Sequence, residues 1–327
     1  MTRPKLPWHE AQWARFERMR DSGRVPHALM LRGVAGVGKR EFADRLAALL
    51  LCEGSDRPCG KCRGCRLFES GSHPDFLRLQ PEEGRQTIGI DQIRGLIEHV
   101  VLTTTYGGYK LVVVEPAEAM THPAANTLLK TLEEPPGRAV IILVSHRSGA
   151  LPATIRSRCQ MLDFPVPGSR EALAWLAARA ADGTDAEALL RLAGGVPLRA
   201  LAMAQAGGVE AGADLFADLA GLVEARSDPV AVAAEWRGRG ISEIGGWLIS
   251  LTSDLIRLRM DADCAVLTHA ELRETMQPVA RRLDLGTLFE LLDQCLELRW
   301  FSQKQVSLNE QLLLENLAIR WAAADGR

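Results

Sequence analysis

The chain has 327 residues, of which 47% are apolar and 24% are charged. This length exceeds what one hydrophobic core usually serves, so more than one domain is expected, and the composition is that of a folded globular protein. The 39 basic and 41 acidic residues leave a net charge of -2, which excludes a global basic field that would hold nucleic acid by charge alone. The N-terminal residues lack the apolar core of a secretory signal, and no apolar run approaches the ~18 residues of a membrane span, so we expect a cytoplasmic protein without membrane contact.

Apolar runs typical of buried strands alternate with helical patterns in the first half of the chain. Apolar side chains at helical spacing predict helices over 39–51, from about residue 91, and over 124–132. Strands this apolar, separated by helices, predict a five-stranded parallel sheet covered on both faces. The expected strands are 27–32, 75–79, 110–114, 139–144 and 160–164.

The second half of the chain is expected to be helical, because no convincing strand pattern follows Pro165, Pro167 and Gly168. A small helical unit is expected up to about residue 206, with an internal turn at 194–197, followed by a linker at Gly207–Gly208. Long amphipathic segments then predict a helical bundle, and they lie at 246–259, 283–300 and 308–321. The expected domains are 1–167, 168–207 and 208–327.

A glycine-rich segment, Gly33-Val-Ala-Gly36-Val-Gly38-Lys39, follows the first expected strand and opens a helix. Its glycines would let backbone N–H groups turn toward phosphate oxygens, the helix N-terminus adds positive potential, and Lys39 could reach the terminal phosphates of a nucleotide. The next residue is Arg40, where a phosphate-binding loop (P-loop) has Ser or Thr to ligate Mg²⁺. The alternative is a tight glycine turn that serves packing alone.

The end of the expected strand 110–114 should carry an acidic pair if the chain hydrolyses ATP, one carboxylate for Mg²⁺ and one that activates the attacking water. The sequence has Glu115 followed by Pro116, which has no side chain that could orient water. Glu118 comes next and is interpreted as a solvated loop carboxylate. A nucleotide could therefore bind at this site, whereas hydrolysis is not expected.

Four of the seven cysteines, Cys52, Cys59, Cys62 and Cys65, lie in one short stretch. Four thiolates at this spacing can close a tetrahedral shell with no open position for a reactive water, which fits a structural Zn²⁺. The alternatives are an iron–sulfur cluster and free buried cysteines. Close backbone turns between the ligands would be eased by Gly60 and Gly64. The remaining cysteines are expected to be small packing residues: Cys159, Cys264 and Cys295.

A loop before the last expected strand contains Arg156-Ser157-Arg158-Cys159. An arginine at the end of a short packed segment suits a phosphate, because its planar fork donates two hydrogen bonds and keeps its charge. The chain's own P-loop lacks the residues for hydrolysis, so the nucleotide of a neighbouring subunit is the better target. Arg158 would then be an arginine finger in trans. The alternative is an exposed structural arginine.

These motifs together resemble the AAA+ clamp-loader family, and within it the delta-prime subunits of bacterial DNA polymerase III. The string Leu128-Leu-Lys-Thr-Leu-Glu-Glu-Pro-Pro136, combined with Ser157-Arg158-Cys159, is highly specific for clamp-loader AAA+ proteins. The missing hydrolytic residues favour the delta-prime branch over the motor subunits. The resemblance covers most of the chain, and its other matching segments are 26–29, the cysteine insert 52–65, 103–106 and 308–314.

The resemblance implies an AAA+ P-loop domain, a small helical lid and a helical collar that oligomerises. It implies a hetero-pentamer with gamma or tau motor subunits and a delta subunit, which loads the sliding clamp onto primer-template DNA. The complex belongs to a DNA-directed DNA polymerase holoenzyme, a nucleotidyltransferase. Ser157 and Arg158 would serve a neighbour's ATP site, and the four clustered cysteines would hold zinc. Leu198 would take the place of a lid arginine that contacts nucleotide in active relatives, with Arg199 one residue away.

Two other functions, those of a motor subunit and of a small-molecule kinase, explain less of the sequence. An ATP-hydrolysing motor subunit of the same loader could use Glu115 for Mg²⁺ but lacks the catalytic glutamate. A P-loop small-molecule kinase would need a substrate-binding lid, and the long helical second half and the 157–159 loop argue against it. The leading hypothesis is therefore an assembly subunit that does not hydrolyse ATP on its own.

Overall fold

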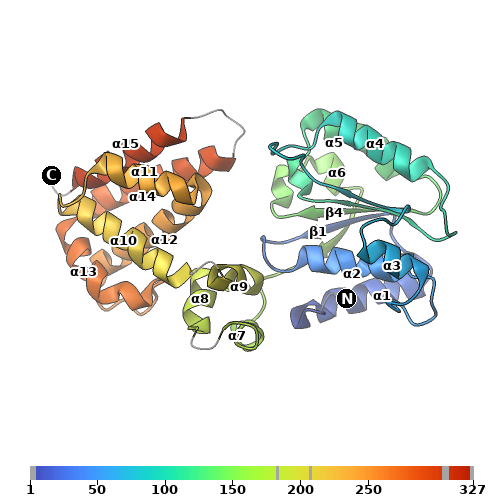
Figure 1. Ribbon diagram of the computed structural model, residues 1–327, viewed down its shortest axis with the longest axis horizontal. Helices are drawn as coiled ribbons and strands as arrows, with labels where there is room; N and C mark the ends of the chain where they lie inside the picture. Colours follow the sequence, from blue (N-terminus) through green and yellow to red (C-terminus); the bar gives the residue numbers. More distant parts are fainter. Residues whose placement is uncertain (1–4, 182–183, 206–207, 304–308, 325–327) are drawn as a thin grey trace. The chain divides into compact units, whose positions relative to one another are not determined.

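The computed structural model describes residues 5–181, 184–205, 208–303 and 309–324. The chain divides into two compact units, Met1–Ala172 and Leu173–Arg327 (Figure 1). The first unit contains a β-sheet and helices, and the described residues of the second unit contain helices but no strand. Among the described residues, no helix is both long enough and apolar enough to cross a membrane.

The first unit is built on a five-stranded sheet in which every pairing is parallel, in the order β2-β3-β4-β1-β5. All residues of β3 and β4 are buried, as expected for central parallel strands covered on both faces. The predicted parallel sheet is therefore confirmed, with strand ends that differ from the expected ranges by at most one residue. The strands are β1 Ala28–Arg32, β2 Phe76–Leu79, β3 Lys110–Val114, β4 Ala139–Ser145 and β5 Gln160–Asp163.

Helices cover both faces of this sheet (Figure 1). Alternate strand residues such as Met30, Val112 and Ile141 form one core cluster with α4 and α5. Helices α1 and α2 lie on the opposite face. The predicted helix over 39–51 has those bounds, whereas the other two begin one or two residues before the expected positions. The helices are η1 Pro7–His9, α1 Glu10–Asp21, α2 Lys39–Leu51, α3 Arg63–Glu69, α4 Ile90–Val101, η2 Ala117–Ala119, α5 His122–Glu133, η3 Ser148–Ala150 and α6 Ala153–Arg156.

Helices α10 to α15 of the second unit pack around a hydrophobic core in which Trp236 and Trp321 are fully buried. The expected segment 246–259 lies inside α12, and the expected helix at 308–321 begins at Glu310, with Leu308 outside the described residues. Gly208 of the expected linker is the first residue of α10, and Gly207 also lies outside the described residues. The helices are α7 Ser169–Ala177, which begins in the first unit, α8 Ala186–Leu192, α9 Pro197–Gln205, α10 Gly208–Val223, α11 Pro229–Arg239, α12 Ile241–Met260, η4 Ala270–Leu272, α13 Arg273–Arg282, α14 Leu285–Gln303 and α15 Glu310–Ala322.

The N-terminal segment packs directly against the glycine-rich loop between β1 and α2. The carbonyl of Val37 accepts hydrogen bonds from Trp8 Nε1 at 2.9 Å and from His9 Nε2 at 2.8 Å. A Cβ at Gly38 would lie 2.2 Å from Leu6 Cδ1, and the φ of Gly38 is +93°, so only glycine fits there. The loop is therefore held in place by the chain's own N-terminus.

The buried ring of His9 should make the stability of the first unit depend on pH. Burial lowers the pKa of His9 to about 4, below the ~6.5 of an unfolded chain. Between these two pH values, His9 is protonated in the unfolded state and neutral in the folded state. The free energy of unfolding therefore decreases as pH falls from about 6.5 toward 4. We expect this one residue to remove about 2 kcal/mol between about pH 7 and about pH 5.

The check is urea unfolding of the wild-type chain and of His9→Gln at both pH values. Glutamine keeps an N–H donor for Val37 but does not titrate, so the acid-induced loss should be smaller in the variant. Equal losses in the two proteins would contradict the assignment.

Candidate functional site

The glycine-rich loop has the geometry of a P-loop with its lysine turned inward. Gly36 and Gly38 have φ values of +86° and +93°, and Lys39 opens α2. Lys39 Nζ donates to the carbonyls of Gly33 and Val34, both at 2.6 Å. Burial lowers the pKa of Lys39 to about 8, with partial compensation by nearby carboxylates. The lysine is thus held by the carbonyls of its own loop.

Gly33 also serves packing, as the alternative interpretation of the loop proposed. A Cβ at this position would lie 2.1 Å from the carbonyl oxygen of Phe164, which no side chain could tolerate. The backbone after β5 therefore passes directly over the start of the loop. Two of the loop glycines, Gly33 and Gly38, are required by close packing whether or not a phosphate binds.

Glu115, at the end of β3, faces arginines. Its Oε2 accepts from Arg78 Nη1 at 3.1 Å and lies 3.7 Å from Arg40 Nε. Arg78 also forms an ion pair with Asp44 of α2. The sequence motifs indicate Arg40 and Glu115 at this site, but they give no sign of Asp44 or of the role of Arg78. The available signal was Arg78 itself, a charged residue inside the otherwise apolar strand β2.

Glu118 is not a solvated loop carboxylate, so that interpretation was wrong. Its Oε1 accepts from the backbone N–H groups of His146 and Arg147, at 2.9 and 3.2 Å. Its Oε2 is buried with no hydrogen-bond partner among the described residues. Glu118 therefore ties the turn after β3 to the backbone that follows β4, an interaction between segments 28 residues apart that local spacing does not reveal.

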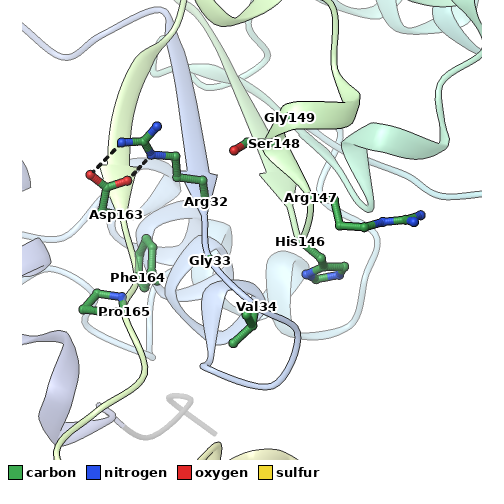
Figure 2. Close-up of a pocket in the computed structure, with 10 residues that line it drawn as sticks. All are labelled: Arg32, Gly33, Val34, His146, Arg147, Ser148, Gly149, Asp163, Phe164 and Pro165. Carbon is green, nitrogen blue, oxygen red and sulfur yellow. Dashed lines mark hydrogen bonds and ion pairs between the residues drawn. The ribbon is translucent and has the colours of Figure 1, made fainter. Parts of the chain in front are cut away.

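A cavity of about 510 Å³ opens beside the P-loop at the edge where β1, β4 and β5 end (Figure 2). This is the edge of a parallel α/β sheet at which ligands usually bind. Figure 2 shows Arg32 paired with Asp163 on one side and His146 and Arg147 on the other. Burial lowers the pKa of His146, so its ring is neutral at neutral pH. The remaining lining residues are Gly33, Val34, Ser148, Gly149, Phe164 and Pro165.

Ser157 and Arg158 directly follow the short helix α6. Arg158 Nε donates to Glu133 Oε1 at 2.6 Å, Nη2 pairs with the same oxygen, and Nη1 donates to the Thr154 carbonyl at 2.9 Å. The Arg158 side chain is one-third exposed. These partners lie on α5 and α6. Cys159 packs against the sheet core, as expected, and burial raises its pKa to about 12.

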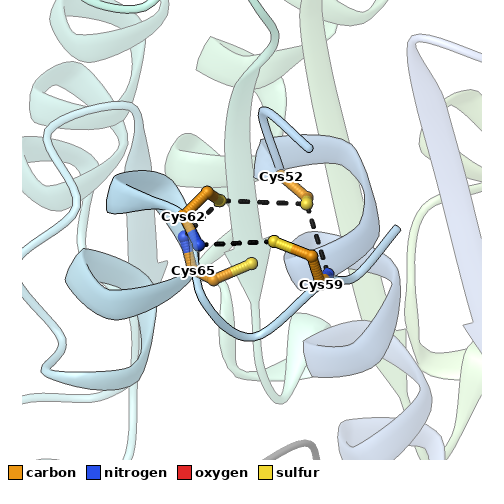
Figure 3. Close-up of side chains that lie close together, drawn as sticks. All are labelled: Cys52, Cys59, Cys62 and Cys65. Atoms are coloured by element: carbon orange, nitrogen blue, oxygen red, sulfur yellow. Dashed lines mark hydrogen bonds between the residues drawn. The ribbon is translucent and has the colours of Figure 1, made fainter. Parts of the chain in front are cut away.

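Cys52, Cys59, Cys62 and Cys65 come together between α2 and α3 (Figure 3). Their Sγ atoms all lie within 4.8 Å of one another, and Cys52 Sγ is 3.8 Å from Cys62 Sγ. A tetrahedral Zn²⁺ with bonds of about 2.3 Å would space its sulfurs about 3.8 Å apart, so the cluster has the dimensions of a four-thiolate metal site.

The backbone around the cluster favours thiolates. Cys52 Sγ accepts N–H groups from Gly54 and Cys59, Cys59 Sγ accepts from Cys62, and Cys62 Sγ accepts from Cys65, all at 3.3 to 3.4 Å. The backbone N–H groups of Lys61 and Cys62 lower the pKa of Cys59 to about 6, whereas burial raises the pKa of Cys52 and of Cys65. All four cysteines are free of disulfides. The predicted glycines fit too, since Gly60 has a φ of +67° and a Cβ at Gly64 would lie 2.5 Å from the Leu51 carbonyl.

Two cysteines in the second unit differ in burial. Cys295 is fully buried in the helical core, as expected, whereas Cys264 is only half-buried, with its thiol 3.6 Å from the Val266 carbonyl. The lid residues singled out by the sequence lie on α9, where Leu198 is half-buried and Arg199 is exposed.

A buried ion pair explains the 103–106 string. Asp75 accepts the backbone N–H groups of Thr105 and Tyr106 and pairs with Lys110 Nζ at 2.8 Å. Hydrogen bonds and the lysine together lower the pKa of Asp75 despite its burial. These contacts fasten the loop before β3 to the segment before β2, which is a structural role.

Comparison with known proteins identifies the family. The family model described as "DNA polymerase III, delta subunit" matches residues 8–167, and "DNA polymerase III, delta subunit, C terminal" matches residues 210–323. DNA polymerase III subunit delta' of Pseudomonas aeruginosa is 37% identical over 98% of both chains. The Escherichia coli K12 protein of the same name is 32% identical over 96% of this chain and 94% of that protein. The chain belongs to the delta-prime subunit family of DNA polymerase III.

Proposed function

We propose that the chain is a hydrolysis-deficient clamp-loader subunit that helps to place the sliding clamp on primed DNA. Its partners in this proposal are gamma or tau motor subunits and a delta subunit in a hetero-pentamer in the cytoplasm, with the clamp and DNA bound through the complex. The main support for this proposal is the contrast between the chain's own phosphate site and Arg158. The chain's own phosphate site lacks hydrolytic residues and is closed by internal ion pairs, whereas Arg158 lies at the surface.

The chain's own site does not fit hydrolysis of Mg²⁺-bound ATP. Arg40 stands where a hydroxyl would ligate the metal, and Pro116 stands where a carboxylate would orient water. Glu115 is the remaining carboxylate on the strand, and it pairs with Arg78. The P-loop backbone and Lys39 could still accept phosphates, so weak nucleotide binding is compatible with this proposal while turnover is not.

Arg158 is suited to act on a neighbour's nucleotide as an arginine finger in trans, with Ser157 beside it. Glu133 and the Thr154 carbonyl accept hydrogen bonds from the guanidinium, so these contacts favour one orientation before a partner arrives. An exposed ion pair of this kind is worth only about 0–1 kcal/mol. A triphosphate with several negative charges can therefore engage the guanidinium without a large cost for loosening the contact with Glu133. Glu133 is a positioning residue in this proposal.

The four clustered cysteines are proposed to hold one structural Zn²⁺. The ion would bind the Sγ atoms of Cys52, Cys59, Cys62 and Cys65 and fix the loop between α2 and α3, with no open coordination position for chemistry. Support comes from the sulfur spacing, from the N–H donors to three of the sulfurs and from the glycines that permit the turns.

The purified chain should not turn over ATP. We expect a steady-state ATPase rate at the level of Lys39→Ala, because a catalytic carboxylate is missing at Pro116 in both proteins. Phosphate release measured with Mg²⁺ and primed DNA present checks this. Turnover that Lys39→Ala abolishes would instead support the motor-subunit alternative.

Arg158→Ala should lower the DNA-stimulated ATPase rate of the reconstituted loader by up to ~10³-fold, because the charge that stabilises the transition state is lost. Assembly of the complex, measured by gel filtration, should be unchanged. A wild-type rate in a complete complex would remove the finger assignment.

Glu133→Gln should have a smaller effect on the same rate, a loss of about two- to fivefold, because it removes one exposed ion pair and frees the guanidinium to sample other rotamers. Glu134→Gln is the matched control, since it neutralises the adjacent carboxylate, which forms no hydrogen bond or ion pair with Arg158 in the described part of the chain. Equal effects of the two substitutions would show that Glu133 does not position the finger.

Metal analysis of the purified chain should return one zinc per chain. Removal of the metal with a chelator should lower the thermal midpoint of the first unit by at least about 5 °C, because binding energy at a structural site is folding energy. Cys65→Ser should reproduce the loss, and Cys264→Ser, which changes a cysteine outside the cluster, should not. A metal-free chain with an unchanged midpoint would contradict the zinc site.

A further inference from the structure

A cluster of four charged side chains occupies the position where the P-loop, α2 and β3 meet. Asp44 and Glu115 supply the carboxylates, and Arg40 and Arg78 supply the guanidiniums. Three of these side chains are largely buried, with exposed fractions of 1% for Asp44, 10% for Glu115 and 17% for Arg78. Such a cluster is costly to bury unless its charges compensate one another, and here they do.

Three elements bring the cluster together. Arg78 is the third residue of β2, beside Val113 in the β2–β3 register, so its side chain reaches the end of β3 where Glu115 begins the turn. Arg40 and Asp44 are four residues apart on α2 and therefore share one face of that helix. The β2 strand and the α2 helix thus approach Glu115 from two directions.

Two arginines contact the Glu115 carboxylate where a P-loop enzyme would hold a divalent cation. A P-loop enzyme holds Mg²⁺ between the strand carboxylate and the hydroxyl that follows the P-loop lysine. In this chain the hydroxyl is replaced by Arg40, and both arginines approach the same oxygen, Glu115 Oε2, at 3.1 and 3.7 Å. The two guanidiniums supply two positive charges, which the Asp44 and Glu115 carboxylates balance. A dication placed there would meet two like charges and lose its main protein ligand.

We infer that Arg78, assisted by Arg40, takes the place of the divalent cation, so that the phosphate site of this chain excludes Mg²⁺. The inference rests on the proposed lack of hydrolysis and names the side chain that enforces it. Asp44 completes the substitution, because it anchors the second arm of the Arg78 guanidinium and leaves the first arm for Glu115.

The test uses Mn²⁺ as a paramagnetic probe for the Mg²⁺ position, with the full-length, zinc-loaded chain and electron paramagnetic resonance of unbound Mn²⁺. The wild-type chain should retain no Mn²⁺ at this site. Arg78→Ser should uncover Asp44 and Glu115, two oxygen ligands of the kind that Mn²⁺ and Mg²⁺ prefer, and should raise Mn²⁺ affinity at least about tenfold.

Three controls tie the result to the cluster. Arg78→Ser combined with Glu115→Gln should lose the gained Mn²⁺ affinity. Arg78→Lys should keep a positively charged side chain beside Glu115 and should therefore gain no Mn²⁺ affinity. Arg85→Ser removes an exposed arginine whose ion-pair partner among the described residues is Glu82, so it should behave as wild type. A folded Arg78→Ser chain that binds no more Mn²⁺ than wild type would overturn the inference.

The wild-type chain keeps the inference testable if Arg78→Ser does not fold. Mn²⁺ binding by the wild type that Glu115→Gln abolishes would overturn it directly. Arg78→Ser is not expected to hydrolyse ATP, because Pro116 still lacks a carboxylate. ATP turnover by the wild type would therefore sink the proposed function, whereas Mn²⁺ at Glu115 without turnover would sink this inference alone.

Discussion

The register of β1 with its two neighbours is the constraint on which the candidate site depends. Arg32, the last residue of β1, lies beside Ser145 of β4 and Asp163 of β5. The three strands therefore end at one level, and Gly33, His146 and Phe164 leave the sheet together. This coincidence forms the cavity and brings the Phe164 carbonyl so close to Gly33 that only glycine fits. A slip of one residue in either pairing would separate the loop from the wall that this pairing positions.

The two charged sites of the first unit differ in burial, and therefore in the free energy that it costs to replace one partner of an ion pair. Removing one partner from a buried ion pair such as Arg78–Glu115 costs about 3–5 kcal/mol, because the other charge is left uncompensated. Loosening an exposed pair such as Arg158–Glu133 costs about 0–1 kcal/mol. The charges of one site are thus held by internal partners, while the Arg158 guanidinium could exchange its partner in the proposed complex. The proposed division between a subunit that does not hydrolyse ATP and one that assists hydrolysis follows from this difference.

Sequence spacing could predict the features that are local in the chain. The strands, the P-loop and the four cysteines each depend on residues close together in the sequence, and the structure has them where expected. The interactions that local spacing cannot show join distant segments: Glu118 to the backbone after β4, Arg78 to Asp44 and Glu115, and Glu133 to Arg158. Glu118 was misjudged as solvated for that reason, since a carboxylate in a loop has the same local pattern whether water or backbone N–H groups surround it.

The N-terminal segment adds a further consequence for the P-loop. In a nucleotide-binding P-loop, backbone N–H groups and the helix N-terminus face the bound phosphates. Here Trp8 and His9 donate to the Val37 carbonyl, and Leu6 packs against Gly38, so contacts within the chain hold the loop. Lys39 is likewise held by backbone carbonyls, and Glu115 by arginines. Since none of these contacts needs a nucleotide, the loop is held in this conformation by the chain itself. In the proposed complex, the surface that presents Arg158 would therefore not depend on a nucleotide bound to this chain.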